Sequence, residues 1–344
     1  MKISYTRKNS IFSSVLLIIS SSFIGILFAL FVKGFLVHGD TEPLSNFILL
    51  GILTGAIIPA TFLFLTPYLK KLYTMPLWVT IFILPCIYAL VIGIDYGITF
   101  SLTFGFKYFF SESFIFETIV FSLIISAVMI FLETVNRLIG QKVLAGLLTG
   151  KYHKPVSEER FVMFLDIAGS TSIAENIGDI QFHSFLNDFF CDISTPLMDN
   201  YGDIYKYVGD EVIITWFYKK QKNLRSPLDA FFSVCATIKN NEQKYLKKYG
   251  IIPEFRAGLH YGRVILGEMG SYKQEIAILG DVMNTTSRIQ ATCRPLNVNL
   301  LISKAAKEKL LQLYKKEASR EFTSTGEYEL RGKEGVTELF TAGD

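Results

Sequence analysis

The chain has 344 residues, of which 50% are hydrophobic and only 19% are charged, and this composition is too apolar for an average soluble protein. Its formal net charge of +3 is too small to argue for nucleic acid as a partner. The four cysteines are widely scattered and form no Cys-x-x-Cys pair, so neither a zinc site nor a disulfide framework is predicted. Charge appears mainly after Asn136, which indicates a membrane half followed by a soluble half.

Four apolar stretches in the first half are long enough to be transmembrane helices. We place them in a transmembrane domain of residues 1–135, at about 11–33, 46–69, 75–94 and 114–133. Lys and Arg precede the first stretch and follow the second and fourth, whereas the loop 38–45 has neither. The positive-inside rule then predicts a multi-pass protein of the cell inner membrane, with the N-terminus and the soluble half in the cytoplasm. A signal peptide is the alternative for the first stretch, and the further spans argue against it.

Two regions of the membrane half leave their role open. Residues 97–110 are apolar but short and contain Lys107, so we expect an external or interfacial segment there. The bundle is either a plain anchor in the lipid bilayer or a receptor for an unknown ligand or partner, for which Glu117 is a candidate contact. Residues 136–158 continue at roughly helical spacing and predict a helical linker, which either connects the halves or transmits a movement between paired chains.

The soluble half begins with the stretch Phe161–Thr171, whose apolar run predicts a buried strand that ends at Asp166. A carboxylate at a strand end is rigid and still reaches water, as a hard cation requires. The small residues that follow lead into a helix, and their backbone N–H groups could hold a phosphate. The alternative is that Asp166 only caps this helix.

A helix is expected from Ile173 to about Tyr201, followed by two strands joined in a tight hairpin at Gly209 and Asp210. Asp210 is therefore a second carboxylate at a strand end. Two such groups brought together could hold two divalent ions, although Gly-Asp in a hairpin is usually only a turn. Glu211 is expected to be an exposed first residue of the next strand.

A second helix is predicted at 227–249, and then a strand pair that turns at Tyr261-Gly262-Arg263. Arg263 either clamps a phosphate or is an exposed turn residue. His260 is expected to be a structural residue of the strand.

The next strand ends at Gly280, and Asp281 is expected to cap the helix that follows. Asn284 and Arg288 are four residues apart, so they share one face of this helix near its positive end. They either bind an anion there or are merely solvated. Arg331 lies near the last strands.

In their order and spacing, these motifs resemble the class III nucleotidyl cyclase catalytic domain over about residues 160–340. The matching segments are Phe164-Leu-Asp-Ile-Ala-Gly-Ser-Thr171, Lys206-Tyr-Val-Gly-Asp210, Gly258-Leu-His-Tyr-Gly-Arg263, Gly280-Asp-Val-Met-Asn284 with Arg288, and Leu330-Arg-Gly332. The resemblance implies a ferredoxin-like α/β domain, an α+β sandwich, at residues 159–344. It also implies a head-to-tail homodimer with its sites at the interface, and membrane-bound members of the family often carry similar N-terminal bundles.

The resemblance further implies a role for each site residue. Two Mg²⁺ or Mn²⁺ ions would be held by Asp166, Ile167 and Asp210. The substrate would be bound by Lys206, Ala277, Arg263, Gly169, Ser170 and Thr171, with Arg263 at the terminal phosphates and Lys206 at the purine. The catalytic residues Asn284, Arg288 and Arg331 would come, like Lys206, from the other subunit.

The function implied is that of a membrane-bound adenylate cyclase, in which the ribose 3′-hydroxyl of ATP attacks the α-phosphate with the help of two metal ions and pyrophosphate leaves. The Lys206 ammonium suits the N1 acceptor of adenine. The family usually has Asp or Thr where this chain has Ala277, so a guanylate cyclase of the same fold is one alternative. A receptor whose cyclase-like domain only binds nucleotide is the other. A cyclase for cyclic dinucleotides is disfavoured because no Gly-Gly-Asp-Glu-Phe segment occurs.

Overall fold

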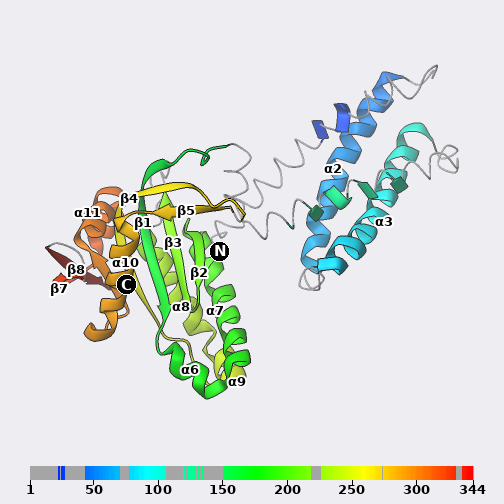
Figure 1. Ribbon diagram of the computed structural model, residues 1–344. Coiled ribbons are helices and arrows are strands. Elements are labelled where there is room, and N and C mark those ends of the chain that lie inside the picture. Colours follow the sequence, from blue (N-terminus) through cyan, green and yellow to red (C-terminus); the bar gives the residue numbers. More distant parts are fainter. Residues whose placement is uncertain are drawn as a thin grey trace. The chain divides into compact units, whose positions relative to one another are not determined.

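The computed structural model describes residues 43–69, 77–105, 150–217, 226–272, 274–330 and 335–343, with a few residues between 22 and 27 and between 119 and 134 (Figure 1). The chain forms two compact units, whose main ranges are Arg7–Leu148 and Thr149–Asp344.

The first unit contains two long apolar helices, α2 (Leu44–Leu69) and α3 (Leu77–Phe104). By length and composition, Leu44–Leu65 and Phe82–Thr103 are both able to cross a membrane. These helices match the second and third predicted spans. Part of the segment 97–110, which we expect to be external or interfacial, is helical, because α3 continues through position 97 to Phe104. The first and fourth spans, Glu117 and most of the linker lie largely outside the described residues.

The second unit is built on one mixed sheet in the order β2-β3-β1-β4-β6-β8-β7, with β5 paired to the far part of β4. Its strands are β1 (Val156–Ile167), β2 (Asp203–Val208), β3 (Glu211–Phe217), β4 (Phe255–Met269), β5 (Glu275–Leu279), β6 (Leu300–Ser303), β7 (Phe322–Glu329) and β8 (Val336–Ala342). The central strand β1 is antiparallel to both β3 and β4, whereas β4 and β6 are parallel. The helices are α6 (Ser170–Ile177), α7 (Asp179–Asp199), α8 (Pro227–Asn240), α9 (Glu242–Tyr249), α10 (Asp281–Leu296) and α11 (Lys304–Leu313), followed by the 3₁₀ helix η3 (Lys315–Ser319).

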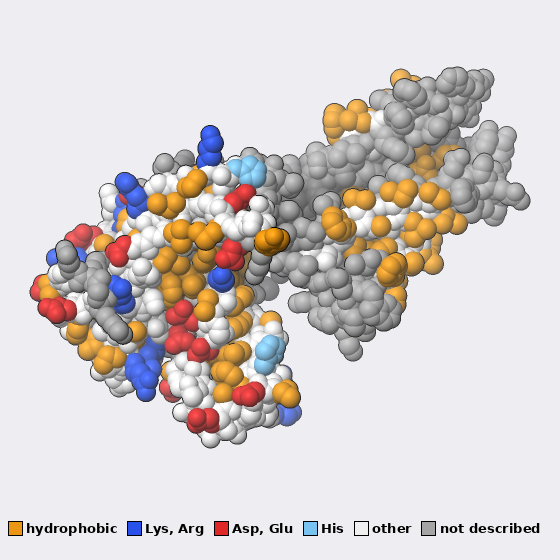
Figure 2. Space-filling view, viewed as in Figure 1, with side chains coloured by type: hydrophobic (Ala, Val, Ile, Leu, Met, Phe, Trp, Pro, Cys, Tyr) orange, Lys and Arg blue, Asp and Glu red, His pale blue; other side chains and the backbone are white. Residues whose placement is uncertain are grey.

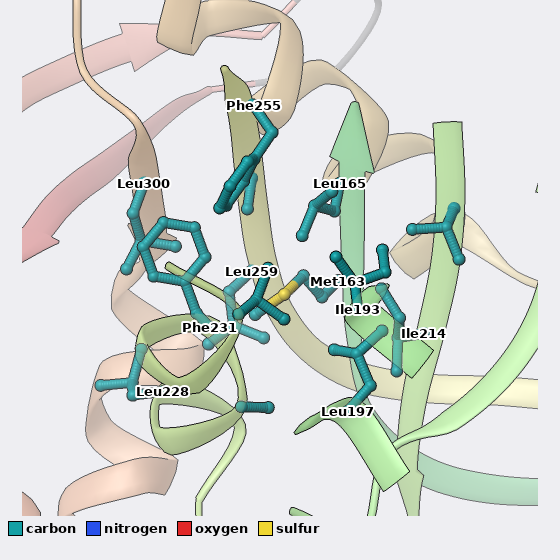
Figure 3. Close-up of a cluster of buried hydrophobic side chains, with 14 of the residues drawn as sticks. Met163, Leu165, Ile193, Leu197, Ile214, Leu228, Phe231, Phe255, Leu259 and Leu300 are labelled. Carbon is teal, nitrogen blue, oxygen red and sulfur yellow. The ribbon is translucent and has the colours of Figure 1, made fainter. Parts of the chain in front are cut away.

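Alternation along β1 divides the core into two layers. Met163 and Leu165 point into the larger layer, where strand residues pack against Ile193 of α7 and Phe231 of α8 (Figure 3). Residues of α6, α9 and α11 complete this layer. The alternate residues of β1 face the other way and share a smaller cluster with Val282 of α10. The site described below lies at the end of this two-sided strand.

Strand β4 is continuous through Tyr261–Arg263, so the predicted strand pair is wrong. It pairs with β1 without interruption from Phe255 to Leu266. Gly262 makes no turn but allows α10 to approach, because a Cβ there would lie 2.7 Å from Cγ2 of Val282. Conversely, each of the two long predicted helices is divided: α6 ends before Gly178, which has a positive φ of 80°, and α8 ends before Asn241.

A buried group of charged side chains lies where β1 begins. Glu158 and Arg160 have side chains only 5% and 8% exposed, and the Arg160 Nη2 atom lies 2.7 Å from Oε2 of Glu158. Lys151 reaches the other oxygen of Glu158 at 2.9 Å, and Arg160 also donates to Thr215. Burial alone would raise the pKa of Glu158, but the hydrogen bonds from Lys151 and Arg160 outweigh it and hold that pKa below its usual 4.5.

We predict that Glu158→Leu lowers the free energy of unfolding by about 3 kcal/mol at pH 7, because it leaves the buried Arg160 guanidinium with only the Asp203 carboxylate at 3.9 Å. Urea unfolding, followed by the fluorescence of the buried Trp216, measures this loss. The measurement uses the full chain with Trp78→Phe, which removes the other of its two tryptophans.

Since the pKa of Glu158 is lowered in the folded chain, the difference between the two proteins should be complete above pH 4.5 and shrink as the pH falls below that value. Adding Arg160→Met should recover most of the loss, because no buried charge is then unpaired. Equal losses in the single and double variants would contradict this explanation.

Candidate active site

Two carboxylates predicted at strand ends are brought together by the sheet. Asp166 is the penultimate residue of β1, and Asp210 lies in the two-residue turn between β2 and β3, where Gly209 has a φ of 64°. The carboxyl groups of Asp166 and Asp210 lie within hydrogen-bond reach of each other. Figure 2 shows acidic side chains gathered near this end of β1. The predictions of the strand end and of the hairpin are thus confirmed.

Glu211 is a third acidic residue of this group, and its predicted exposure is wrong. As the first residue of β3 it pairs directly with Asp166 across the sheet, and its side chain is partly buried. Burial raises the pKa of Glu211 to about 7, with further contributions from the charges of Asp166 and Asp210. Burial and the facing Asp210 carboxylate likewise raise the pKa of Asp166 to about 6. The sequence signal that could have placed Glu211 in this acidic group is its position directly after the hairpin turn.

The carboxylates fit a divalent cation that also binds phosphate. Among the described residues, no three His, Cys, Asp or Glu side chains are placed to hold an ion by themselves. Mg²⁺ is usually bound by one or two carboxylates together with substrate phosphates, and Asp166 and Asp210 provide such a pair. The Ile167 side chain is buried in the core, so only its backbone is able to contact an ion.

The small-residue turn after β1 leads into the N-terminus of α6. Gly169 is the N-cap in a left-handed conformation, with a φ of 71°, and no side chain caps the first turn, which begins with Ser170 and Thr171. Backbone N–H groups at such a helix start attract anions. The turn therefore offers donors to a phosphate three residues beyond Asp166.

The arginine opposite Asp166 is Arg256, which the sequence reasoning missed. Arg256 and Asp166 form a direct cross-strand pair between β4 and β1, so their side chains leave the same face of the sheet. Arg263 is opposite Glu159 instead, seven residues farther along β4 and about 23 Å away. Arg263 is therefore too far to contact a phosphate held by Asp166 of its own chain. Only the strand register distinguishes the two arginines.

Helix α10 presents Asn284 and Arg288 on one face, one turn apart, as predicted. Asn284 is exposed and Arg288 is partly exposed. Their helix is preceded by Gly280 as the N-cap, so the prediction that Asp281 caps it is wrong; Asp281 is the first helical residue and accepts a hydrogen bond from Thr285.

The buried side of α10 carries Gln290, which donates from Nε2 to Oδ2 of Asp166 at 3.4 Å. Gln290 is two residues from Arg288 and therefore about 160° away around the helix. Asn284 and Arg288 consequently point away from the Asp166 of their own chain.

The remaining predicted residues lie on other strands. Lys206 is exposed on β2, where its ammonium lies 3.4 Å from the Glu275 carboxylate of β5. Ala277 is buried two residues along β5 from Glu275. His260 is buried with Nδ1 2.6 Å from Oγ of Ser303, which confirms its structural role. Arg331 lies outside the described residues.

We predict that Asp210→Asn raises the free energy of unfolding of the metal-free protein by about 1 kcal/mol at pH 7–8. The variant removes the charge that faces Asp166. The raised pKa of Asp166 means that the folded wild type loses stability as the pH rises from about 4 to about 6, so the gain should vanish below pH 4. Urea unfolding in EDTA, followed by Trp216 fluorescence, measures the gain.

Asp188→Asn is the matched control, because its carboxylate is paired with Lys248 at 2.8 Å and its loss should lower stability instead. A stability loss in Asp210→Asn would show that Asp210 is held by attractive rather than repulsive contacts.

The comparisons with known proteins agree on the family of the second unit. The family described as the adenylate and guanylate cyclase catalytic domain matches residues 152–343. Adenylate cyclase 2 of Rhizobium meliloti (strain 1021) is 36% identical over 215 residues, which cover 62% of this chain and 58% of the relative. A receptor-type guanylate cyclase of Caenorhabditis elegans is 23% identical over 185 residues, which cover 53% of this chain and 17% of that protein.

The solved structure of a bacterial light-regulated adenylyl cyclase shares the fold, with a TM-score of 0.52 and 20% identity over 64% of this chain and 63% of that chain. The chain thus spans less than two thirds of the length of each of these proteins. The family match covers more than half of the sequence, and the chain therefore belongs to the adenylate and guanylate cyclase family.

Proposed function

We propose that this chain is a membrane-bound adenylate cyclase that converts ATP to cyclic AMP and pyrophosphate as a homodimer. The observation that carries the proposal is the pairing of Asp166 with Asp210 in a chain that also presents Asn284 and Arg288 on one accessible helix face. A receptor that only bound nucleotide would need groups that bind phosphate. It would not need both the Asp166–Asp210 pair and the Asn284–Arg288 pair. The 36% identity to a protein named adenylate cyclase supports the same conclusion.

The two faces of α10 support a site shared between two chains. Because Asn284 and Arg288 point away from their own Asp166, a second copy placed head to tail is needed to bring such residues to it. Exposed apolar side chains that such a copy would bury lie on β2, β4 and β5, namely Tyr207, Val208, Ile265, Met269 and Leu279. Apolar side chains are visible over β4 and β5 in Figure 2.

In the proposed reaction, a bond forms between the ribose 3′-oxygen and the α-phosphorus, the 3′-hydroxyl proton is released to water, and the bond from that phosphorus to the pyrophosphate oxygen breaks. Bound divalent ions would lower the pKa of the 3′-hydroxyl and neutralise the leaving pyrophosphate. Asp166 and Asp210 would hold these ions, and the α6 N-terminus and Arg256 would bind phosphate oxygens. From the partner chain, Asn284 would orient the ribose and Arg288 would stabilise charge on the α-phosphate.

Lys206 supports ATP as the substrate, because its ammonium is a donor that matches the N1 acceptor of adenine, whereas guanine carries an N1–H donor. The Glu275 carboxylate holds this ammonium at the edge of β2. Production of cyclic GMP is the second candidate, since Ala277 offers no polar side chain to select the base. The membrane half would place the catalytic domain at the cytoplasmic face of the inner membrane, and the apolar helices α2 and α3 support the membrane association.

We predict that the purified full chain forms cyclic AMP from ATP with Mn²⁺, and that Asp166→Ala lowers the turnover by about a hundredfold or more. Product analysis by chromatography with ATP and with GTP measures both results. Glu338→Ala on β8 is the control and should keep its turnover, because it removes only the surface contacts of Glu338 with Lys304 and Ser324. Cyclic GMP as the main product would overturn the substrate, and binding of nucleotide without any product would favour the receptor.

We also predict that inactive Asp210→Ala chains and inactive Asn284→Ala chains recover activity when they are mixed. Random pairing makes half of the dimers mixed, and one of their two sites is intact, so about a quarter of the wild-type activity should return. Activity after co-expression, compared with each variant alone, is the measurement. If the mixture is as inactive as its components, the site lies within one chain.

A further inference from the structure

Helix α10 touches the acidic site of its own chain through one buried side chain. Gln290 is only 9% exposed, and its amide donates to Oδ2 of Asp166 at 3.4 Å. Asp166 also lies within hydrogen-bond reach of the Asp210 carboxyl group and of the backbone of Ile167. An amide in this position restricts the orientation of the carboxylate, as the outer contacts of metal ligands commonly do.

The position of Gln290 is fixed by the backbone beneath it. A Cβ on Gly258 of β4 would lie 2.5 Å from the backbone nitrogen of Gln290 and 2.8 Å from its Cα. The helix therefore rests directly on the strand at this point, two residues from Arg256. A displacement of α10 along β4 necessarily moves the Gln290 amide relative to Asp166.

The opposite side of the same helix carries Asn284 and Arg288. Within the single helix Asp281–Leu296, Arg288 is separated from Gln290 by two residues and by about 160° of rotation. The peptide hydrogen bonds of a helix make such a segment move as one body. A shift imposed on one side is therefore felt on the other.

We propose that α10 links the two catalytic sites of the homodimer, with Gln290 as the positioning residue at the Asp166 end. Gln290 holds Asp166 in one site, while Asn284 and Arg288 of the same helix serve the site of the partner. Ion and substrate binding at one site thus changes the position of the groups offered to the other. The inference rests on the proposed function, because it requires a metal at Asp166 and a site shared between chains.

The first test is the affinity for Mn²⁺ in the full chain, measured from the electron paramagnetic resonance signal of free Mn²⁺ with unreactive 3′-deoxy-ATP present. Gln290→Leu should weaken Mn²⁺ binding about tenfold. Gln290→Met, which fills the same space with a more flexible side chain, should do the same. Thr286→Val is the matched control, because Thr286 is buried on the same helix and donates only to Val282, so its affinity should stay unchanged. Unchanged affinity in both Gln290 variants would overturn the positioning role.

The second test uses dimers made from Asp210→Ala chains and Asn284→Ala chains, in which the working site takes its aspartates from the second chain and its α10 residues from the first. Gln290→Leu is added only to the Asp210→Ala chain, beside the dead site. The link predicts that kcat of the working site falls by about threefold or more, although its own Asp166 contact is intact. Unchanged kcat would overturn the link.

The outcomes separate this inference from the function on which it rests. If the parent mixture shows no recovered activity, the shared site fails and the link between sites falls with it. The Mn²⁺ titration needs no turnover, so it still decides whether Gln290 positions Asp166. If the parent mixture is active but insensitive to Gln290→Leu on the Asp210→Ala chain, only the link is rejected.

Discussion

The antiparallel register of β1 with β3 and β4 determines what surrounds Asp166. On one side it sets Glu211 against Asp166, and on the other it sets Arg256 there. A slip of one residue would turn Asp166 to the opposite face of the sheet and expose Leu165. That slip is prevented because the alternate residues of β1 fill two separate apolar layers. The packing of the core thus holds the carboxylate in place.

The acidic group costs stability that the rest of the domain must supply. Asp166, Asp210 and Glu211 are brought close enough for Asp166 and Glu211 to bind protons far above their usual pH. Such repulsion has no use in a folded domain by itself, and it favours any cation that binds among the carboxylates. The opposite arrangement exists at the other end of β1, where Glu158 and Arg160 neutralise each other. One strand therefore carries a stabilising charge pair and a destabilising acidic group at its two ends.

Local sequence patterns were enough to predict the parts of the site that depend on neighbours in the chain. The end of β1 at Asp166, the hairpin turn at Asp210 and the shared face of Asn284 and Arg288 follow from short-range periodicity and turn chemistry. Arg256 and Gln290 could not be predicted in this way, because the contact of each with Asp166 depends on strand register or on helix packing. The same limit produced the wrong turn at Gly262, where the glycine serves a distant helix. In the sequence, a glycine that makes a turn between two apolar runs looks the same as a glycine that makes room for a packed helix.

Glycine at Gly258 and Gly262 explains why one helix can serve two purposes. Both residues lie on the same face of β4, four positions apart, and they let α10 approach the strand closely, with its backbone against Gly258 and its Val282 side chain against Gly262. The buried side of the helix can then reach Asp166 through Gln290, while the other side remains accessible. A domain built in this way presents Asn284 and Arg288, the groups proposed to be catalytic, where they cannot reach its own aspartates. Under the proposed function, activity then depends on how two copies of the domain pair, because only a second copy brings Asn284 and Arg288 to Asp166.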